Sequence, residues 1–242
     1  MLGGVCLLTL GCGSQQAASP SAPAAGGGQA QQQAGGTEPV VNRVIMAVTI
    51  DVETNDPLRV SMGSSGQLQM RPIYDRLIGY DANNGKLIPE LADSWAVEDG
   101  GKALRFKLKK GIVFHDGAGE MTSVDVQSTL EQTMIPSSTQ YNVAFFRSVI
   151  DGFDVSNPYE AVVKLKEPNA EFLNAISAQG WGGEISSKAG LDKLGRTPTM
   201  QDRPIPGTGP YTYDGRAQGQ WLRFKRVDRK STRLNSSHVK RS

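Results

Sequence analysis

Three carboxylates stand close together in a short loop of this 242-residue chain. Asp51, Glu53 and Asp56 follow an apolar run, and Thr54 lies between them. Carboxylates at this spacing can transfer protons in acid/base catalysis, or they can bind an amine or a cation. Side chains at the end of a strand are more often solvated or bound to a polar ligand than catalytic. The loop therefore indicates ligand binding rather than catalysis.

Metal and thiol chemistry have little support in the sequence. Two histidines, His115 and His238, cannot build a His-rich metal site, and no cluster of cysteines is present to complete one. His115 has no second His, Cys or Ser nucleophile at a recognisable spacing, so we interpret it as a turn residue. We expect no metal site and no cofactor. Cys6 and Cys12 both lie at the start of the chain, so the rest must fold without a disulfide.

The N-terminal residues predict a lipid anchor followed by a tether. Residues 1–12 contain an apolar run that leads to Cys12, which is similar to a bacterial lipoprotein signal, although Thr9 and the lack of a preceding Lys or Arg depart from that pattern. Cys12 would then be lipidated. The run is too short to span a bilayer. Residues 13–37 contain only Gly, Ala, Gln, Ser, Pro and Thr, a composition that favours a flexible tether.

The last fifteen residues are interpreted as foreign sequence. Residues 228–238 read DRKSTRLNSSH, which is the translation of a widely used sequencing adapter. Without residues 228–242 the chain has 21 Lys and Arg against 23 Asp and Glu, so the net charge of +2 comes from this tail. A basic patch for nucleic acid or a membrane is the alternative interpretation. We expect the native part of this sequence to end near Val227 and the gene product to be truncated there, and we expect no nucleic-acid partner.

Residues 38–227 form the expected globular body. The β-rich run Arg43–Ile50 predicts a strand that ends at the acidic loop. Apolar spacing predicts a helix over 65–77, and the polar run Tyr80–Gly85 predicts a turn.

Two hairpins are predicted from alternating side chains. The first joins Trp95–Val97 to Ala103–Lys109, in which apolar residues alternate with cations, the pattern of a sheet with one solvated face. The second surrounds Asn157-Pro158 and continues through the alternating residues 161–166.

Helices and a further strand pair are predicted around these hairpins. Thr122–Asp125 is similar to a capping box and begins a predicted helix, and Pro168–Ile176 predicts another. Strands are predicted over Tyr211–Asp214 and Trp221–Arg226. The preceding run Gly207–Pro210 lacks the Gly-Lys-Ser/Thr end of a phosphate loop, which disfavours nucleotide binding.

Several motifs of this body together resemble one protein family. In order and spacing they resemble the extracytoplasmic solute-binding proteins of peptide and nickel ABC importers, known as solute-binding family 5. The resemblance covers Val44–Val227. The motifs that carry it are Leu77–Asp81, Gly85–Trp95, Phe106–Gly117, Thr122–Val126 and Gly207–Tyr211.

The resemblance implies an α/β fold of the periplasmic-binding-protein type II class, a two-lobe clamp that closes on its ligand. Members are longer than this chain, so we expect only the first lobe, with an inserted subdomain from about Met70 to Ser186. The second lobe, which in peptide binders holds the ligand termini, is expected to be absent. A single lobe encloses little of a ligand and should bind it weakly.

The resemblance also implies a function without catalysis. The protein is expected to capture oligopeptides or dipeptides for an ABC permease. In order along the chain, Asp51, Glu53, Thr54 and Tyr141 correspond to ligand-facing segments of the family. A carboxylate there would meet an amine or a cationic side chain, and Tyr141 would pack on the peptide backbone.

The N-terminal signal and the resemblance together indicate where the protein acts. We expect a monomer held by its lipid anchor in the periplasm or on the outer face of the cytoplasmic membrane. Within the same fold, a nickel chelate, a sugar or another small solute is an alternative ligand. A secreted hydrolase that uses the acidic loop is the alternative from another class.

Overall fold

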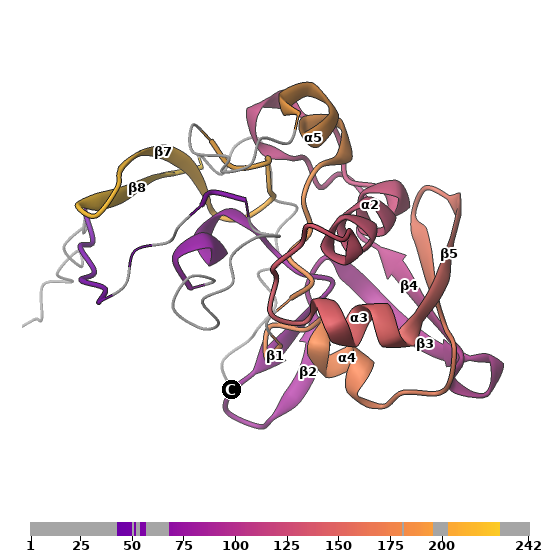
Figure 1. Ribbon diagram of the computed structural model, residues 1–242. Helices are drawn as coiled ribbons and strands as arrows, with labels where there is room; N and C mark the ends of the chain where they lie inside the picture. The colour runs from indigo at the N-terminus through magenta and orange to yellow at the C-terminus, as the bar shows by residue number, and fades with distance from the viewer. Residues whose placement is uncertain are drawn as a thin grey trace, which may run out of the picture. The chain divides into compact units, whose positions relative to one another are not determined.

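A computed structural model describes residues 43–49, 51, 54–56, 68–180, 182–195 and 203–227. The chain divides after Met46 into two units, and of the first unit only 43–46 are described. All helices and strands below belong to the second unit (Figure 1).

The second unit contains a four-stranded antiparallel sheet with the strand order β3-β4-β6-β5. Both predicted hairpins are confirmed as β3–β4 and β5–β6, and the tip of the first is the short 3-10 turn η2 (Asp99–Gly101). The strands are β3 (Ala92–Glu98), β4 (Ala103–Leu108), β5 (Ile150–Asn157) and β6 (Glu160–Leu165).

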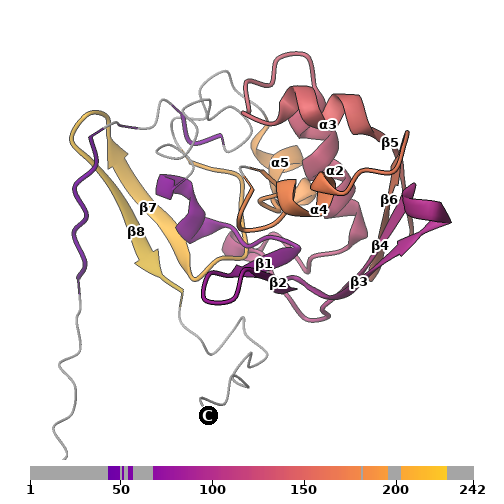
Figure 2. The ribbon, with the colours of Figure 1, turned by 90° about the horizontal axis from the view of Figure 1, so that it is seen from below.

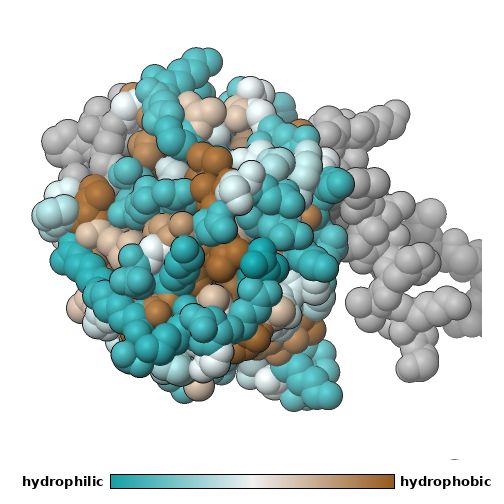
Figure 3. Space-filling model, turned by 90° about the vertical axis from the view of Figure 1, so that its right-hand side faces the viewer, coloured by the Kyte–Doolittle hydropathy of each residue, from teal (hydrophilic) through white to brown (hydrophobic). Residues whose placement is uncertain are grey.

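The sheet has one buried and one solvated face, as the alternation predicts. Leu104, Phe106 and Leu108 of β4 are buried. On the other face, Arg105 bridges Glu98 of β3 at 2.8 Å and Glu160 of β6 at 3.1 Å. The molecular surface on the side of this solvated face is largely hydrophilic, with smaller hydrophobic areas between the polar residues (Figure 3).

Three helices cover the buried face of the sheet (Figures 1 and 2). The predicted capping box of α2 (Ser123–Met134) is confirmed, since the backbone N–H of Thr122 donates to Asp125 Oδ2 at 2.8 Å. The helix α3 (Val143–Val149) was not expected from the sequence. The helix α4 (Glu171–Ala175) begins later than predicted, because the side chain of Asn169 accepts the backbone N–H of Glu171.

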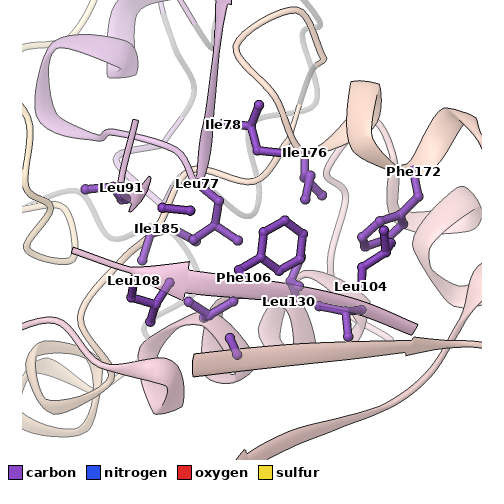
Figure 4. Packing of buried hydrophobic residues seen from close by; sticks show 14 of the residues in the cluster. Leu77, Ile78, Leu91, Leu104, Phe106, Leu108, Leu130, Phe172, Ile176 and Ile185 are labelled. Carbon is purple, nitrogen blue, oxygen red and sulfur yellow. The ribbon is translucent and has the colours of Figure 1, made fainter. Parts of the chain in front are cut away.

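Phe106 lies at the centre of the main hydrophobic core (Figure 4). Its side chain is fully buried, and residues from the sheet, α2 and α4 surround it. Leu77 and Ile185, which are distant in sequence, complete the same cluster. The core therefore joins the sheet to one segment that precedes it in the sequence and to one that follows it.

The helix predicted over 65–77 is correct only in part. The described residues 68–70 are helical and lead into the 3-10 turn η1 (Arg71–Ile73), but the chain is extended from Tyr74. The reason is tertiary: the carbonyls of residues 76 and 77 accept the backbone N–H groups of residues 91 and 92 at 2.9 and 3.0 Å. This pairing overrides the helical spacing of the apolar residues.

A second hairpin follows directly. The strands β1 (Ile78–Asp81) and β2 (Lys86–Pro89) pair in antiparallel fashion. The predicted turn between them is confirmed, and Asp81 Oδ1 accepts the backbone N–H of Asn83 at 2.9 Å.

The two late strands are confirmed as a separate hairpin, β7 (Tyr211–Ala217) and β8 (Trp221–Arg226). Three of its side chains pack on η1 and the residues beside it, forming a small second core. The members of this cluster are Met70, Ile73, Tyr74, Tyr213, Leu222 and Phe224.

The strand predicted over 43–50 is wrong for the residues that the structure describes. Residues 43–49 form no strand, and Val44 and Ile45 are 83% and 76% exposed. A β-rich sequence forms a stable strand only when a neighbouring strand completes its hydrogen bonds. No such neighbour pairs with 43–49 within the described part of the chain.

The helix α5 (Lys188–Leu194) also was not expected, although its signals are local. The side chain of Ser187 caps its first turn, and Gly195 ends it with a positive φ of 64°. Across the residues that the structure describes, no helix is both long and apolar enough to cross a membrane.

Candidate functional site

Asp51 connects the acidic loop to the β7–β8 hairpin. Its Oδ2 lies 3.1 Å from Arg216 Nη2 and accepts the backbone N–H of Gly219 at 2.7 Å. The Arg216 side chain is only 3% exposed, while that of Asp51 is 31% exposed. The carboxylate is therefore fixed in position and still reaches solvent. Glu53, the second predicted carboxylate, lies outside the described residues.

The rest of the loop packs inward. Thr54 is buried, and its Oγ1 accepts the backbone N–H of Asp56 at 3.0 Å. The amide of Asn55 donates to the Tyr213 hydroxyl on β7 at 3.4 Å. Asp56 is fully buried and has interactions of its own. In this arrangement Asp51 is the described carboxylate of the loop that is open to an incoming ligand.

Tyr141 lies on a different element, in the loop between α2 and α3, and is 62% exposed. The loop around it is held from both sides. Arg147 Nε donates to the carbonyl of Met134 at 2.8 Å, and its Nη2 donates to that of Ile135. Next to Tyr141, the side chain of Gln140 accepts the backbone N–H of Asn142 at 2.7 Å. An exposed aromatic ring on a fixed loop is suited to packing against a ligand.

Sequence reasoning missed a group of charged residues near the start of β1. Arg76 and Glu184 form an ion pair whose side chains are 5% and 9% exposed. Glu90 Oε1 accepts the backbone N–H of Arg76 at 3.1 Å. Burial raises the pKa of Glu90 to about 7, against the opposing effect of this hydrogen bond. The three residues come from separate segments, so no local pattern in the sequence indicates the group.

His115 lies in the 3-10 turn η3 (His115–Gly117), as expected for a turn residue, but it is buried and makes long-range contacts. Its backbone N–H donates to the carbonyl of Gly207 at 2.9 Å, and its Nε2 lies 2.9 Å from the carbonyl of Gly209. Thr208 Oγ1 donates to Asp75 Oδ2 at 3.1 Å. The run Gly207–Pro210, called the glycine run below, therefore packs between the η3 turn and the segment that contains Asp75.

Metal-ligating geometry is not found in the part of the chain that the structure describes. No group of three or more His, Cys, Asp or Glu side chains lies close enough there to hold a metal ion. Asp51 provides an accessible carboxylate, and Tyr141 provides an accessible ring on a separate element. A carboxylate can bind a cationic group, and an aromatic ring can pack on a ligand.

The chain matches the model of one protein family and is similar in sequence to a transport protein. The profile of a family described as bacterial extracellular solute-binding proteins, family 5 Middle, matches residues 86–236. Over 202 residues the chain is 28% identical to the probable ABC transporter periplasmic-binding protein SapA of Escherichia coli strain K12. That similarity covers 76% of this chain and 36% of SapA.

Two solved structures have a similar fold. The periplasmic binding protein DppA from Helicobacter pylori, in complex with the peptide STSA, matches with a TM-score of 0.61 and 22% identity over 75% of this chain and 38% of that chain. NikZ from Campylobacter jejuni, in complex with Ni(L-His), matches with a TM-score of 0.59 and 24% identity over 73% and 34%. The chain therefore spans about a third of the length of these proteins.

Proposed function

This chain belongs to family 5 of the bacterial extracellular solute-binding proteins, and we propose that it is part of a protein that captures peptides for an ABC importer. The α/β fold is that of a type II periplasmic binding protein, of which the chain holds a part, as the sequence predicts. The family match over residues 86–236 carries the proposal. The relatives are transport binding proteins, and we propose that this protein likewise performs no catalysis.

Oligopeptides or dipeptides are the proposed ligands. The similarity to DppA, which was solved with a bound peptide, supports this class, and the similarity to NikZ keeps a nickel chelate as the alternative. In the proposed site, Asp51 and Glu53 meet the amine or a cationic side chain of the peptide, Thr54 supports their loop, and Tyr141 packs on the peptide backbone. The solvent-accessible carboxylate of Asp51 and the exposed ring of Tyr141 support these roles.

The proposed setting is extracytoplasmic. A lipid on Cys12 would hold the protein at the membrane, and residues 13–37 would act as a tether to a monomeric binding domain. The permease of an ABC importer would be its membrane partner. The periplasmic location that the name of SapA states supports the setting.

Ligand binding by the protein encoded by the complete reading frame tests the proposal. That frame is recovered from the source DNA, so that any further lobe is present. Calorimetric titration then compares a dipeptide, a tetrapeptide and a nonapeptide with Ni(L-His) and a monosaccharide. We expect saturable binding of at least one peptide, which mass spectrometry recovers uncleaved. Binding of the nickel complex or the sugar alone would replace the peptide class, and cleavage of the peptide would favour a hydrolase.

A further inference from the structure

A cavity of about 340 Å³ lies between the η3 turn and one face of α5. Its walls include the small or apolar residues Ala118, Ala189, Leu194 and Pro206. The glycines of the η3 loop contribute backbone without side chains. This volume is near the lower end of the range for small-molecule sites, about 300 to 1,000 Å³. It therefore suits a ligand much smaller than a peptide.

Charges of both signs line this cavity. Asp116 comes from η3, Lys193 from α5, and Arg203 from the segment that precedes the glycine run. A ligand with one positive and one negative group can be held at both ends by such a set. A purely apolar ligand would form no charge-assisted contact with any of these three side chains.

A buried acceptor lies beside the cavity. Asp116 and Arg203 also line an adjoining chamber of about 10 Å³, large enough for one water molecule, and His115 forms another part of its wall. Because a carbonyl only accepts, His115 Nε2 carries the proton that it donates to Gly209, and in the neutral ring Nδ1 is then an acceptor. His115 is 7% exposed, and Nδ1 has no hydrogen-bond partner in the part of the chain that the structure describes.

Hydrogen bonds fix the frame of the cavity before any ligand arrives. Ser187 Oγ donates to the carbonyl of Ala118 at 3.3 Å, and the backbone N–H of Ser187 donates to that of Pro206 at 2.9 Å. His115 joins the same frame through its backbone bond to Gly207. The start of α5, the η3 turn and the glycine run are thus linked in a ring. A preformed site loses little conformational entropy when it binds.

We propose that this cavity binds a free α-amino acid with an apolar side chain. Its carboxylate binds Lys193 and Arg203, and its ammonium group binds Asp116. A water in the small chamber links the ammonium end to His115 Nδ1, and the apolar walls enclose the side chain. The proposal involves none of the residues assigned to peptide binding, so the two proposals can be tested independently of each other.

Nuclear magnetic resonance of the full 242-residue chain tests this proposal. Valine is compared with isovalerate, which lacks the ammonium group, and with isobutylamine, which lacks the carboxylate. We expect valine to cause saturable shifts of the Gly117 and Lys193 amides and of the His115 Nδ1 resonance. Each analogue should bind at least about tenfold more weakly, because it lacks one of the two charged groups that the site would bind. Absence of saturable shifts, or equal binding of isovalerate and valine, would overturn the proposal.

Variants of α5 give a second, independent readout. Ala189→Leu should fill the cavity and abolish the valine shifts, and Lys193→Gln should weaken them up to about fivefold, since Lys193 is exposed. Lys188→Gln is the matched control, because Lys188 pairs with Asp192 at 2.6 Å on the same helix and does not line the cavity. Unchanged binding in both cavity variants, or equal loss in the control, would contradict the assignment.

Discussion

Arg76 and Glu184, 108 residues apart in the sequence, form a buried ion pair that joins the start of β1 to the segment before α5. The two residues also form an isolated antiparallel bridge through their backbones. Arg76 Nε further donates to the carbonyl of Gly182 at 3.3 Å. Charge and backbone pairing therefore hold the same two segments together.

Removal of one partner of this pair should be costly. Glu184→Ala leaves the Arg76 guanidinium buried without its counter-ion, and we expect a loss of about 3 to 5 kcal/mol in the free energy of unfolding. Urea unfolding followed by circular dichroism measures the loss. The double variant Arg76→Met, Glu184→Leu should recover most of it, since it buries no lone charge. A single variant as stable as the wild type would show that the pair contributes little.

Glu90 should make stability depend on pH. Its pKa is about 7 in the folded protein and 4.5 without the effect of folding. Between these values the unfolded chain releases a proton that the folded chain keeps, so the contribution of Glu90 to stability is fully present below pH 4.5 and is lost as the pH rises through 7. The fall is on the order of 3 kcal/mol.

Glu90→Gln tests this relation directly. Urea unfolding at intervals from pH 4.5 to 7 should show a smaller fall for this variant than for the wild type. The control Glu131→Gln changes an exposed glutamate on α2, which accepts a hydrogen bond from Gln127 at 2.7 Å. The control should keep the wild-type slope. Parallel slopes in all three proteins would refute the role of Glu90.

Gly209 should tolerate no side chain. A Cβ at this position would lie 2.5 Å from the carbonyl oxygen of Pro72 and 2.6 Å from the carbonyl carbon of Ile73. We expect Gly209→Ala to lower the thermal midpoint and to destabilise the fold by about 1 to 3 kcal/mol, because the backbone must shift. Gly152→Ala is the control, since nothing lies within 4 Å of its Cβ position. Equal midpoints for both variants would argue against a tight junction.

Tyr141 should contribute to peptide affinity. In the protein from the complete reading frame, Tyr141→Ala should weaken peptide binding by about 1 kcal/mol, or roughly fivefold, through loss of stacking. Calorimetric titration measures the change. Tyr211→Ala is the matched control, because Tyr211 is also an exposed tyrosine, 40% exposed, on the separate hairpin. Wild-type affinity in the Tyr141 variant would remove this residue from the proposed site.

Local signals in the sequence predicted several of the elements whose cause is local, although they missed α5. The alternation of Leu104, Phe106 and Leu108 predicted β4 and its buried face, because the side chains of a strand alternate between two faces. The capping box at Thr122 predicted the start of α2, because it satisfies backbone groups within a single turn. The fold class was predicted in a different way, through the resemblance of several ordered motifs to a known family.

Tertiary contacts decided what lies beyond such short ranges. Residues 74–77 end a stretch with helical apolar spacing but are not helical, because the carbonyls of residues 76 and 77 pair with the backbone N–H groups of residues 91 and 92. Asp51 was recognised as a candidate from its neighbours, but its fixed position depends on Arg216, 165 residues away. His115 likewise meets Gly209 across 94 residues. Partners at such distances are selected by the packing of the whole fold, and no periodicity or motif within one segment specifies them.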